Sequence, residues 1–156
     1  MIVQLLEVAE ENRLKYMPFF LMADECEEIV LQYIHKGSLF TILNEKNDTI
    51  GIMQVLLMDG SCLEIKNFAI QESYRHKGYG KLSIEQILKK AKEEGMQKVI
   101  VGTANSSLEN ILFYQKCQFR FYKIVRNYFL QYPNSIVENG ILAKDMVYFD
   151  YSIESQ

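Results

Sequence analysis

Residues 75–80 read Arg-His-Lys-Gly-Tyr-Gly and lie between an apolar, strand-like segment at 63–70 (LEIKNFAI) and an amphipathic segment at 81–94. The two glycines allow the backbone to come close to a ligand. The helix that follows presents unpaired N–H groups and the positive end of its dipole. The stretch therefore predicts an anion site, suited to a phosphate or pyrophosphate. The alternative is an ordinary strand-to-helix turn.

The segments around this stretch predict a mixed α/β domain. Apolar and β-branched patterns predict strands at 2–8, 38–43, 49–58, 63–70, 98–103, 119–130 and 143–151. Helical spacing predicts helices at 10–35 in two pieces, at 81–94 and at 108–116. We therefore expect one α/β (α+β) domain over residues 1–156, with a mixed, mostly antiparallel sheet of about seven strands flanked by about four helices.

Turn and cap signals indicate how these segments connect. The polar turn at 44–48 and the Asp59-Gly60 pair link three successive strands, which are therefore expected to run antiparallel. Asp24 is a candidate N-cap of the second N-terminal helix, and Gly95 is placed to end the helix after the glycine-rich stretch. The segment 98–103 is short and β-branched, as expected of a buried parallel strand.

Bulk composition narrows the class of protein. Of the 156 residues 49% are hydrophobic and 24% charged, which is ordinary for a soluble globular domain. A net charge of −3 without a block of like charges argues against a nucleic-acid partner. Cys26, Cys62 and Cys117 lack disulfide-framework or zinc spacing, so no metal is expected. Without a membrane-length apolar run or a signal-peptide pattern, we expect a cytoplasmic protein with no membrane partner.

Two motifs carry a resemblance to a known family. Arg75, Gly78 and Gly80 match the pattern Gln/Arg-x-x-Gly-x-Gly/Ala that follows a fourth strand. Residues 113–119 (FYQKCQF) match a second signature, in which Tyr, Lys and Phe follow an aromatic residue or Leu. The chain therefore resembles the GNAT superfamily of acyl-CoA N-acyltransferases, closely over residues 49–128, and within it an uncharacterised bacterial branch.

The resemblance implies acetyl-CoA as the cosubstrate. The glycine-rich loop would bind the CoA pyrophosphate through backbone N–H groups, and a bulge would splay the fourth and fifth strands so that the pantetheine arm lies between them. Asn105 would contact this arm, although the family places that Asn at the position of Ser107. The implied cofactor-binding residues are Phe68, Ala69, Ile70, Arg75, His76, Lys77, Gly78, Tyr79, Gly80, Lys81, Asn105 and Tyr114.

Glu64 is the candidate general base. It lies six residues before Ile70, where several GNAT enzymes carry a Glu that removes a proton from the amine, usually through water. The two-residue period of a strand puts Glu64 on the same face as Phe68, unless a bulge intervenes. The alternative is that Glu64 pairs with Lys66 or a neighbouring strand and that another base or a water chain serves.

Tyr114 is the candidate general acid. By resemblance, its side chain points from the helix of the second motif at the CoA sulfur and protonates the leaving thiolate. The ordinary tyrosine pKa of about 10 keeps the hydroxyl protonated at neutral pH. The alternative is a core aromatic residue on an amphipathic helix.

The expected activity is transfer of the acetyl group of acetyl-CoA directly to a primary amine of a small molecule or peptide. No His or Asn arrangement supports Cys117 as a nucleophile, so direct transfer is preferred to a covalent acetyl-enzyme. The alternative is a catalytically inactive CoA-binding regulatory module. The acidic run Asp24, Glu25, Glu27 and Glu28 could attract a cationic acceptor or could be a solvated helix start. The resemblance also suggests a homodimer.

One position departs from the family pattern. The turn that leaves the helix of the second motif commonly has Gly where this chain has Gln118. A side chain is disfavoured at positive φ, so the turn is expected to differ if the fold needs left-handed backbone there.

Overall fold

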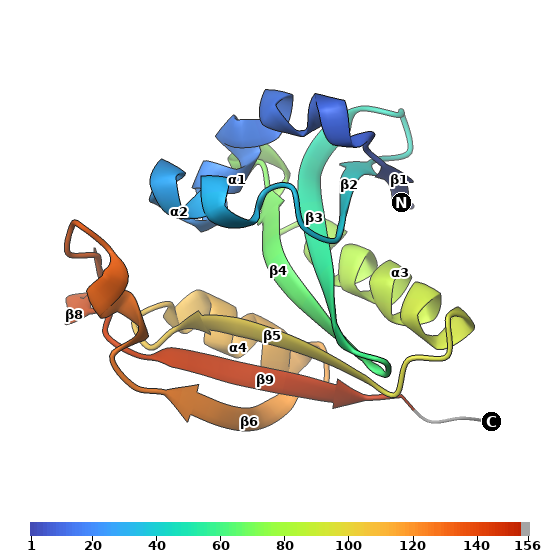
Figure 1. The fold of residues 1–156 in the computed structure, drawn as a ribbon. Coiled ribbons are helices and arrows are strands. Elements are labelled where there is room, and N and C mark those ends of the chain that lie inside the picture. Colours follow the sequence, from blue (N-terminus) through green and yellow to red (C-terminus); the bar gives the residue numbers. More distant parts are fainter. Residues whose placement is uncertain (154–156) are drawn as a thin grey trace.

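The computed structural model describes residues 1–153, and its central element is a seven-stranded sheet in the order β1-β2-β3-β4-β5-β9-β6 (Figure 1). The strands of this sheet are β1 (Gln4–Glu7), β2 (Ser38–Leu43), β3 (Thr49–Asp59), β4 (Cys62–Ile70), β5 (Lys98–Ala104), β6 (Arg120–Val125) and β9 (Met146–Ser152). Neighbouring strands are antiparallel except for the parallel pair β4 and β5. The predicted mixed, mostly antiparallel sheet is confirmed.

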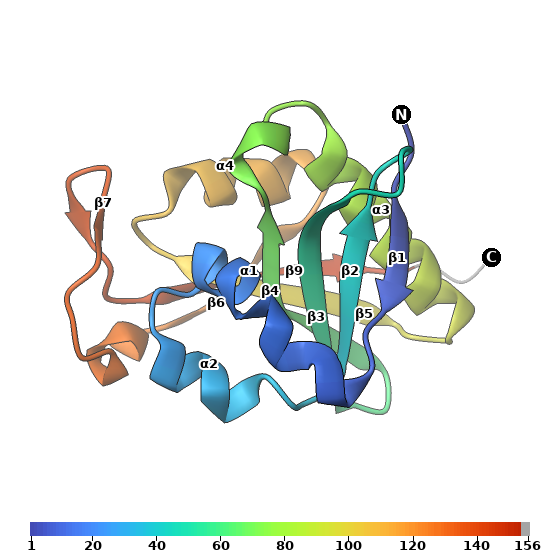
Figure 2. The same ribbon diagram turned by 90° about the horizontal axis from the view of Figure 1, so that it is seen from above.

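Four α-helices cover the two faces of the sheet (Figure 2). They are α1 (Met17–Ala23), α2 (Glu27–Tyr33), α3 (Tyr79–Glu93) and α4 (Leu108–Lys116). Phe20 and Val30 bury α1 and α2 against one face, whereas Ile87 and Tyr114 bury α3 and α4 in the larger core on the other. Within residues 1–153, none of these helices is long and apolar enough to cross a membrane.

Short polar turns connect β2, β3 and β4 as expected. The Asn44 side chain accepts hydrogen bonds from the backbone N–H groups of Lys46 and Asp48, at 3.0 and 2.9 Å. Asp59 accepts from the N–H of Cys62 at 2.9 Å. These bonds satisfy backbone N–H groups that have no strand partner in the turns. At the end of α3, Gly95 has a φ of +78°, as predicted for the residue that ends this helix.

The two helices predicted within 10–35 are present as α1 and α2, and a 3₁₀ helix (Glu10–Tyr16) precedes them. Two local predictions are wrong. Asp24 does not cap α2, because Cys26 is the N-cap and Asp24 follows α1 in extended backbone. The predicted strand at 119–130 ends at Val125, since Asn127 turns the backbone to φ +63° and a 3₁₀ helix (Tyr128–Gln131) follows.

The connection between β6 and β9 carries a small hairpin. Its strands are β7 (Val137–Glu138) and β8 (Ile141–Leu142), which pair with each other and not with the main sheet. Asn139 and Gly140 form the turn at φ +56° and +74°. Residues 137–142 therefore form a hairpin that lies beside the main sheet.

The parallel pair β4 and β5 separates halfway along its length (Figure 1). The two strands pair only from Cys62 and Lys98 to Ile65 and Val101. At this point β4 contains a bulge, because Ile65 pairs with Val55 and Asn67 with Gln54, which leaves Lys66 unpaired. Beyond the bulge β4 follows β3 while β5 follows β9, so the expected splay is present.

The same bulge changes which side chains share a face. Leu63 and Ile65 belong to the α3–α4 core before the bulge, and Phe68 and Ile70 lie against that core after it. Glu64 therefore points to the opposite face from Phe68. The expectation from an unbroken two-residue period is wrong, because one extra residue reverses the alternation.

Gln118 occupies a left-handed cap at the end of α4. Its φ is +71°, its N–H donates to the carbonyl of Gln115 at 3.0 Å, and the N–H of Phe119 donates to the carbonyl of Tyr114 at 3.0 Å. These two bonds form a Schellman motif. The turn thus keeps the backbone that glycine prefers, although the residue is Gln.

Gln118→Gly should raise the free energy of unfolding by about 0.5–1 kcal/mol, since relief of left-handed strain outweighs the added freedom of the unfolded chain. Urea denaturation measures the change. Gln115→Gly, three residues earlier inside α4, is the matched control and should lower stability by about 1 kcal/mol. A loss of stability in both variants would mean that position 118 carries no strain.

Candidate active site

A cleft opens where β4 and β5 separate. It has a volume of about 190 Å³. The residues that line it come from the end of α1 (22–25), from β4 (65–68), from β5 (101–104), from the start and middle of α4, and from the segment that connects β6 to β9. The cleft therefore lies between the two halves of the splayed sheet, with helix ends on either side.

Tyr114 lies on the α4 wall of this cleft. Its ring packs against those of Phe113, Phe119 and Phe149, with centroids 5.1, 5.8 and 6.0 Å away. Burial raises the pKa of Tyr114 above its ordinary value, so the hydroxyl holds its proton well into the alkaline range. The aromatic packing predicted as the alternative is present, and it fixes the ring in this wall of the cleft.

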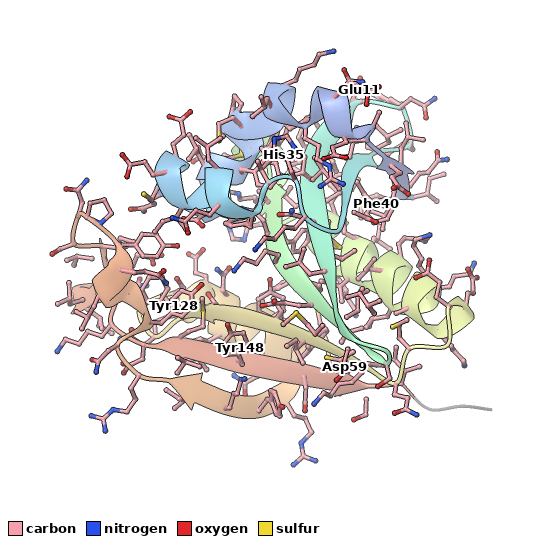
Figure 3. All side chains as sticks on the ribbon, viewed as in Figure 1. Glu11, His35, Phe40, Asp59, Tyr128 and Tyr148 are labelled. Atoms are coloured by element: carbon pink, nitrogen blue, oxygen red, sulfur yellow. The ribbon has the colours of Figure 1, made fainter. Side chains whose placement is uncertain are left out.

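Glu64 borders the cleft without lining it. The side chain is 7% exposed, and burial raises the pKa of its carboxyl while Lys66 and Lys123 oppose the rise. Within residues 1–153 no Lys, Arg or His nitrogen lies within 4.0 Å of it, so the predicted alternative of a pair with Lys66 is not formed. Tyr148, labelled in Figure 3, shares this environment, since burial and then Glu64 raise its pKa. Glu64 is thus a desolvated carboxyl that directly precedes Ile65, which lines the cleft.

Glu64→Gln should increase the stability of the fold at pH 7. A raised pKa means that the folded state binds the proton more tightly than the unfolded chain does, so wild-type stability falls as pH rises above 4.5. The amide carries no charge to desolvate. Urea denaturation at pH 7 and at pH 4.5 should show a gain that shrinks on acidification. Glu85→Gln, on the exposed face of α3, is the matched control and should leave the stability at pH 7 nearly unchanged.

The glycine-rich loop precedes α3 in a left-handed turn. His76 and Gly78 have φ of +60° and +97°, and Gly78 is the N-cap of α3. Arg75 donates from Nε to the carbonyl of Ile70 at 2.7 Å, which ties the loop to the end of β4. The side chains of Lys77 and Lys81 are exposed beside the turn. The loop therefore directs the first N–H groups of α3, with positive charge around them, to the surface.

Tyr79 and Gly80 have structural roles in addition to their predicted role in cofactor binding. The Tyr79 hydroxyl donates to Glu45 at 2.9 Å, so only the backbone of Tyr79 is free to bind a ligand. A Cβ on Gly80 would lie 3.2 Å from the Phe113 ring, so this glycine allows α3 and α4 to pack closely. Gly78 differs, because a Cβ added there would approach only the Met1 side chain, at 3.0 Å.

The end of β4 offers backbone groups to the cleft. Phe68 lines the cleft and its ring lies 6.2 Å from that of Phe113. Ala69 and Ile70 pair with β3 on one edge, and β5 does not pair with them on the other. The edge of β4 beyond Ile65 is therefore open toward the gap, as binding of the pantetheine arm requires.

Asn105 does not reach the cleft. Its Oδ1 accepts from the N–H groups of Lys144 and Asp145 at 2.8 and 3.0 Å, and its Nδ2 donates to the carbonyl of Leu142 at 3.2 Å. The side chain thus fixes the backbone at residues 142–145, just before β9, and is not free to make the predicted contact with the pantetheine arm. Ser107 and Asn110 line the cleft instead.

The acidic run divides between two environments. Asp24 and Glu25 line the cleft, whereas Glu27 and Glu28 are exposed in the first turn of α2. Asp24 accepts hydrogen bonds from the hydroxyls of Tyr33 and Tyr132, at 2.8 and 2.9 Å. The sequence contains no signal for the second bond, because Tyr132 is 108 residues away along the chain.

Comparison with known proteins supplies a family. Residues 5–119 match the model of the acetyltransferase (GNAT) family. The chain is 35% identical over 143 residues to the uncharacterised N-acetyltransferase YvbK of Bacillus subtilis, covering 91% of this chain and 92% of the relative. A GNAT family acetyltransferase from Elizabethkingia anophelis with acetyl-CoA bound superposes with a TM-score of 0.88, at 31% identity and coverage of 97% and 98%. A Bacillus subtilis acetyltransferase in complex with CoA gives 0.83, at 32% identity and coverage of 98% and 99%.

Proposed function

The chain belongs to the acetyltransferase (GNAT) family, and from this premise we propose that it transfers the acetyl group of acetyl-CoA directly to the primary amine of a small molecule or peptide. Acetyl-CoA-dependent N-acetyl transfer is the activity of the family. The direct route, the acceptor and the roles of Glu64 and Tyr114 are the proposed part.

The observation that carries the proposal is the open edge of β4 opposite Tyr114. Beyond Ile65 the strand has no partner on the β5 side, and Tyr114 lies on the wall of the same cleft. A thioester bound along that edge would place its sulfur within the reach of a hydroxyl held by aromatic packing. Such positioning supplies much of the rate of a group transfer.

In the proposed reaction the amine nitrogen attacks the thioester carbonyl, the N–C bond forms and the C–S bond breaks. Tyr114 donates its proton to the departing sulfur. The proton lost by the amine passes to water and through it to Glu64, because Glu64 borders the cleft but does not line it. The raised pKa of Glu64 makes it a better proton acceptor than an ordinary carboxylate.

The state of Cys117 supports direct transfer. The thiol is 8% exposed, and burial raises its pKa to about 11. Nearly all of it is therefore protonated at neutral pH, and the thiolate is the nucleophilic form. Cys117 also does not line the cleft.

Release of free CoA thiol in the presence of a panel of primary amines tests the proposal. We expect amine-dependent release well above the rate of acetyl-CoA hydrolysis without amine. Tight CoA binding with no amine-dependent release would instead favour the alternative, a regulatory module that binds CoA without turnover.

The assembly and location of the protein stay predictions. β6 forms one edge of the sheet, with Phe121 and Ile124 exposed by 62% and 63%, and this edge is a candidate surface for the expected homodimer. Assignment of residues 1–156 to a single domain, a cytoplasmic location and the lack of nucleic-acid and membrane partners are likewise expectations from the sequence.

A further inference from the structure

The carboxylate of Asp24 is held at the cleft without a counter-cation. It is half-buried, and Tyr33 and Tyr132 each donate a hydroxyl to it. Within residues 1–153 no Lys, Arg or His nitrogen lies within 4.0 Å of it. The backbone N–H of Cys26 also donates to Oδ1, at 3.4 Å. Buried charges in proteins are normally paired with an opposite charge, and Asp24 lines the cleft, from which a cation could approach it.

The wall next to Asp24 is aromatic. Tyr128, Phe129 and Tyr132 all line the cleft, and successive ring centroids lie 5.1 and 5.2 Å apart. Figure 3 labels Tyr128 in the half of the molecule that contains β5, β6 and β9. Aromatic faces attract ammonium groups, and the ring of Tyr33 already receives the ammonium of Lys66 at 4.9 Å from its centroid. This region therefore suits organic cations.

Asn67 adds an unpaired hydrogen-bond acceptor. Its side chain is 4% exposed and lines the cleft beside Lys66. Nδ2 donates to the carbonyl of Phe20 at 3.2 Å and to the Tyr33 hydroxyl at 3.1 Å, while Oδ1 has no partner in the described part of the chain. The orientation of the amide is determined, since a carbonyl can only accept. A buried acceptor without a donor is costly, and because Oδ1 is almost fully enclosed, it could accept from a ligand N–H only after a neighbouring group moves.

We propose that Asp24, Asn67 and Tyr132 form a site for a positively charged nitrogen of the acceptor other than the nitrogen that is acetylated. The inference rests on the proposed function, and it assigns the acceptor to the organic cations that carry a second ammonium group. The reacting amine would lie on the Tyr114 side of the cleft and the second ammonium at the end of α1. Among the described residues, three acidic side chains line the cleft (Asp24, Glu25 and Glu138) against one cationic side chain, Lys66, in agreement with this polarity.

The test compares putrescine with n-butylamine, which has the same carbon chain and one amine. With thiol release as the readout, wild type should show a KM for putrescine roughly 10- to 100-fold below that for n-butylamine, the size of a charge-assisted hydrogen bond. Asp24→Asn, which keeps the shape but leaves one oxygen to accept from the tyrosine hydroxyls, should remove this difference by raising the KM for putrescine alone. The kcat values should stay unchanged.

Glu27→Gln is the matched control, because it removes the same charge from the same acidic run at an exposed position outside the cleft. It should leave both KM values unchanged. Equal KM values for the two amines in wild type, or equal increases for both in Asp24→Asn, would overturn the inference and leave acetyl transfer standing. The wild-type comparison decides the question by itself if Asp24→Asn does not fold.

A second measurement separates this inference from the proposed function. If no amine is acetylated, the function fails, and calorimetry of putrescine with the CoA-loaded protein then tests the site alone. Binding to wild type that Asp24→Asn abolishes supports the cation site. Failure of wild type to bind putrescine overturns it.

Discussion

Tyr114→Phe should lower kcat about 100-fold while the affinity for CoA stays unchanged, which is the usual size of the contribution of a positioned acid. The substitution removes the hydroxyl and keeps the ring that packs against Phe119 and Phe149. Burial raises the pKa of Tyr114, and the same dry surroundings disfavour a free thiolate. The pKa values of the proton donor, Tyr114, and of the thiolate that accepts the proton are therefore both raised, so the proton transfer remains feasible.

Thiol release gives kcat for this variant, and calorimetry gives the CoA dissociation constant. Tyr151→Phe is the matched control, since its ring packs 5.4 Å from Phe119 but does not line the cleft. The control should keep wild-type kcat. An unchanged kcat in Tyr114→Phe would remove Tyr114 from the mechanism and leave water as the proton donor.

Gly78→Trp should abolish CoA binding. Gly78 begins α3 at φ +97°, and apart from the Met1 side chain the space beside its Cβ position is empty to 4 Å. An indole would fill the space that the proposed pyrophosphate needs. The left-handed backbone adds a cost of about 1–2 kcal/mol to any side chain at this position.

Gly95→Trp separates the two effects. Gly95 lies just beyond the other end of α3, at φ +78°, and apart from its chain neighbours no atom of residues 1–153 lies within 4 Å of its Cβ position. It carries the same backbone strain but is remote from the loop at residues 75–80. We expect both variants to lose comparable stability by urea denaturation and only Gly78→Trp to lose CoA affinity by calorimetry. Normal CoA binding in Gly78→Trp would show that the loop is not the phosphate site.

Several predictions succeeded because they depended on neighbouring residues. The strand at 63–70, the helix that follows the glycine-rich loop and the helix at 108–116 each carry their own apolar period. The Asn44 and Asp59 turns rest on side chains that bond to backbone within four residues. Such preferences act wherever the segment lies in the fold.

Other predictions failed because a contact from elsewhere overrode the local preference. Asp24 has the chemistry of an N-cap, yet it accepts from the hydroxyls of Tyr33 on α2 and of Tyr132 on the connection between β6 and β9. Asn105 carries the amide expected of a ligand contact, yet it holds the backbone at 142–145. In both cases a partner comes from the connection between β6 and β9, whose position no local pattern encodes.

The sequence by itself determined the order of strands and helices, the position of the glycine-rich loop at residues 75–80 before a helix, and the tyrosine that follows this loop by one helix, one strand and part of a second helix. These features follow from backbone preferences and apolar periodicity over a few residues. Only the tertiary structure decided which residues share the cleft. The bulge at Lys66 reversed the face of Glu64, and the pairing of β9 between β5 and β6 brought Tyr132 to Asp24. Both depend on how distant strands register against one another, and a one-residue shift in register changes which side chains meet.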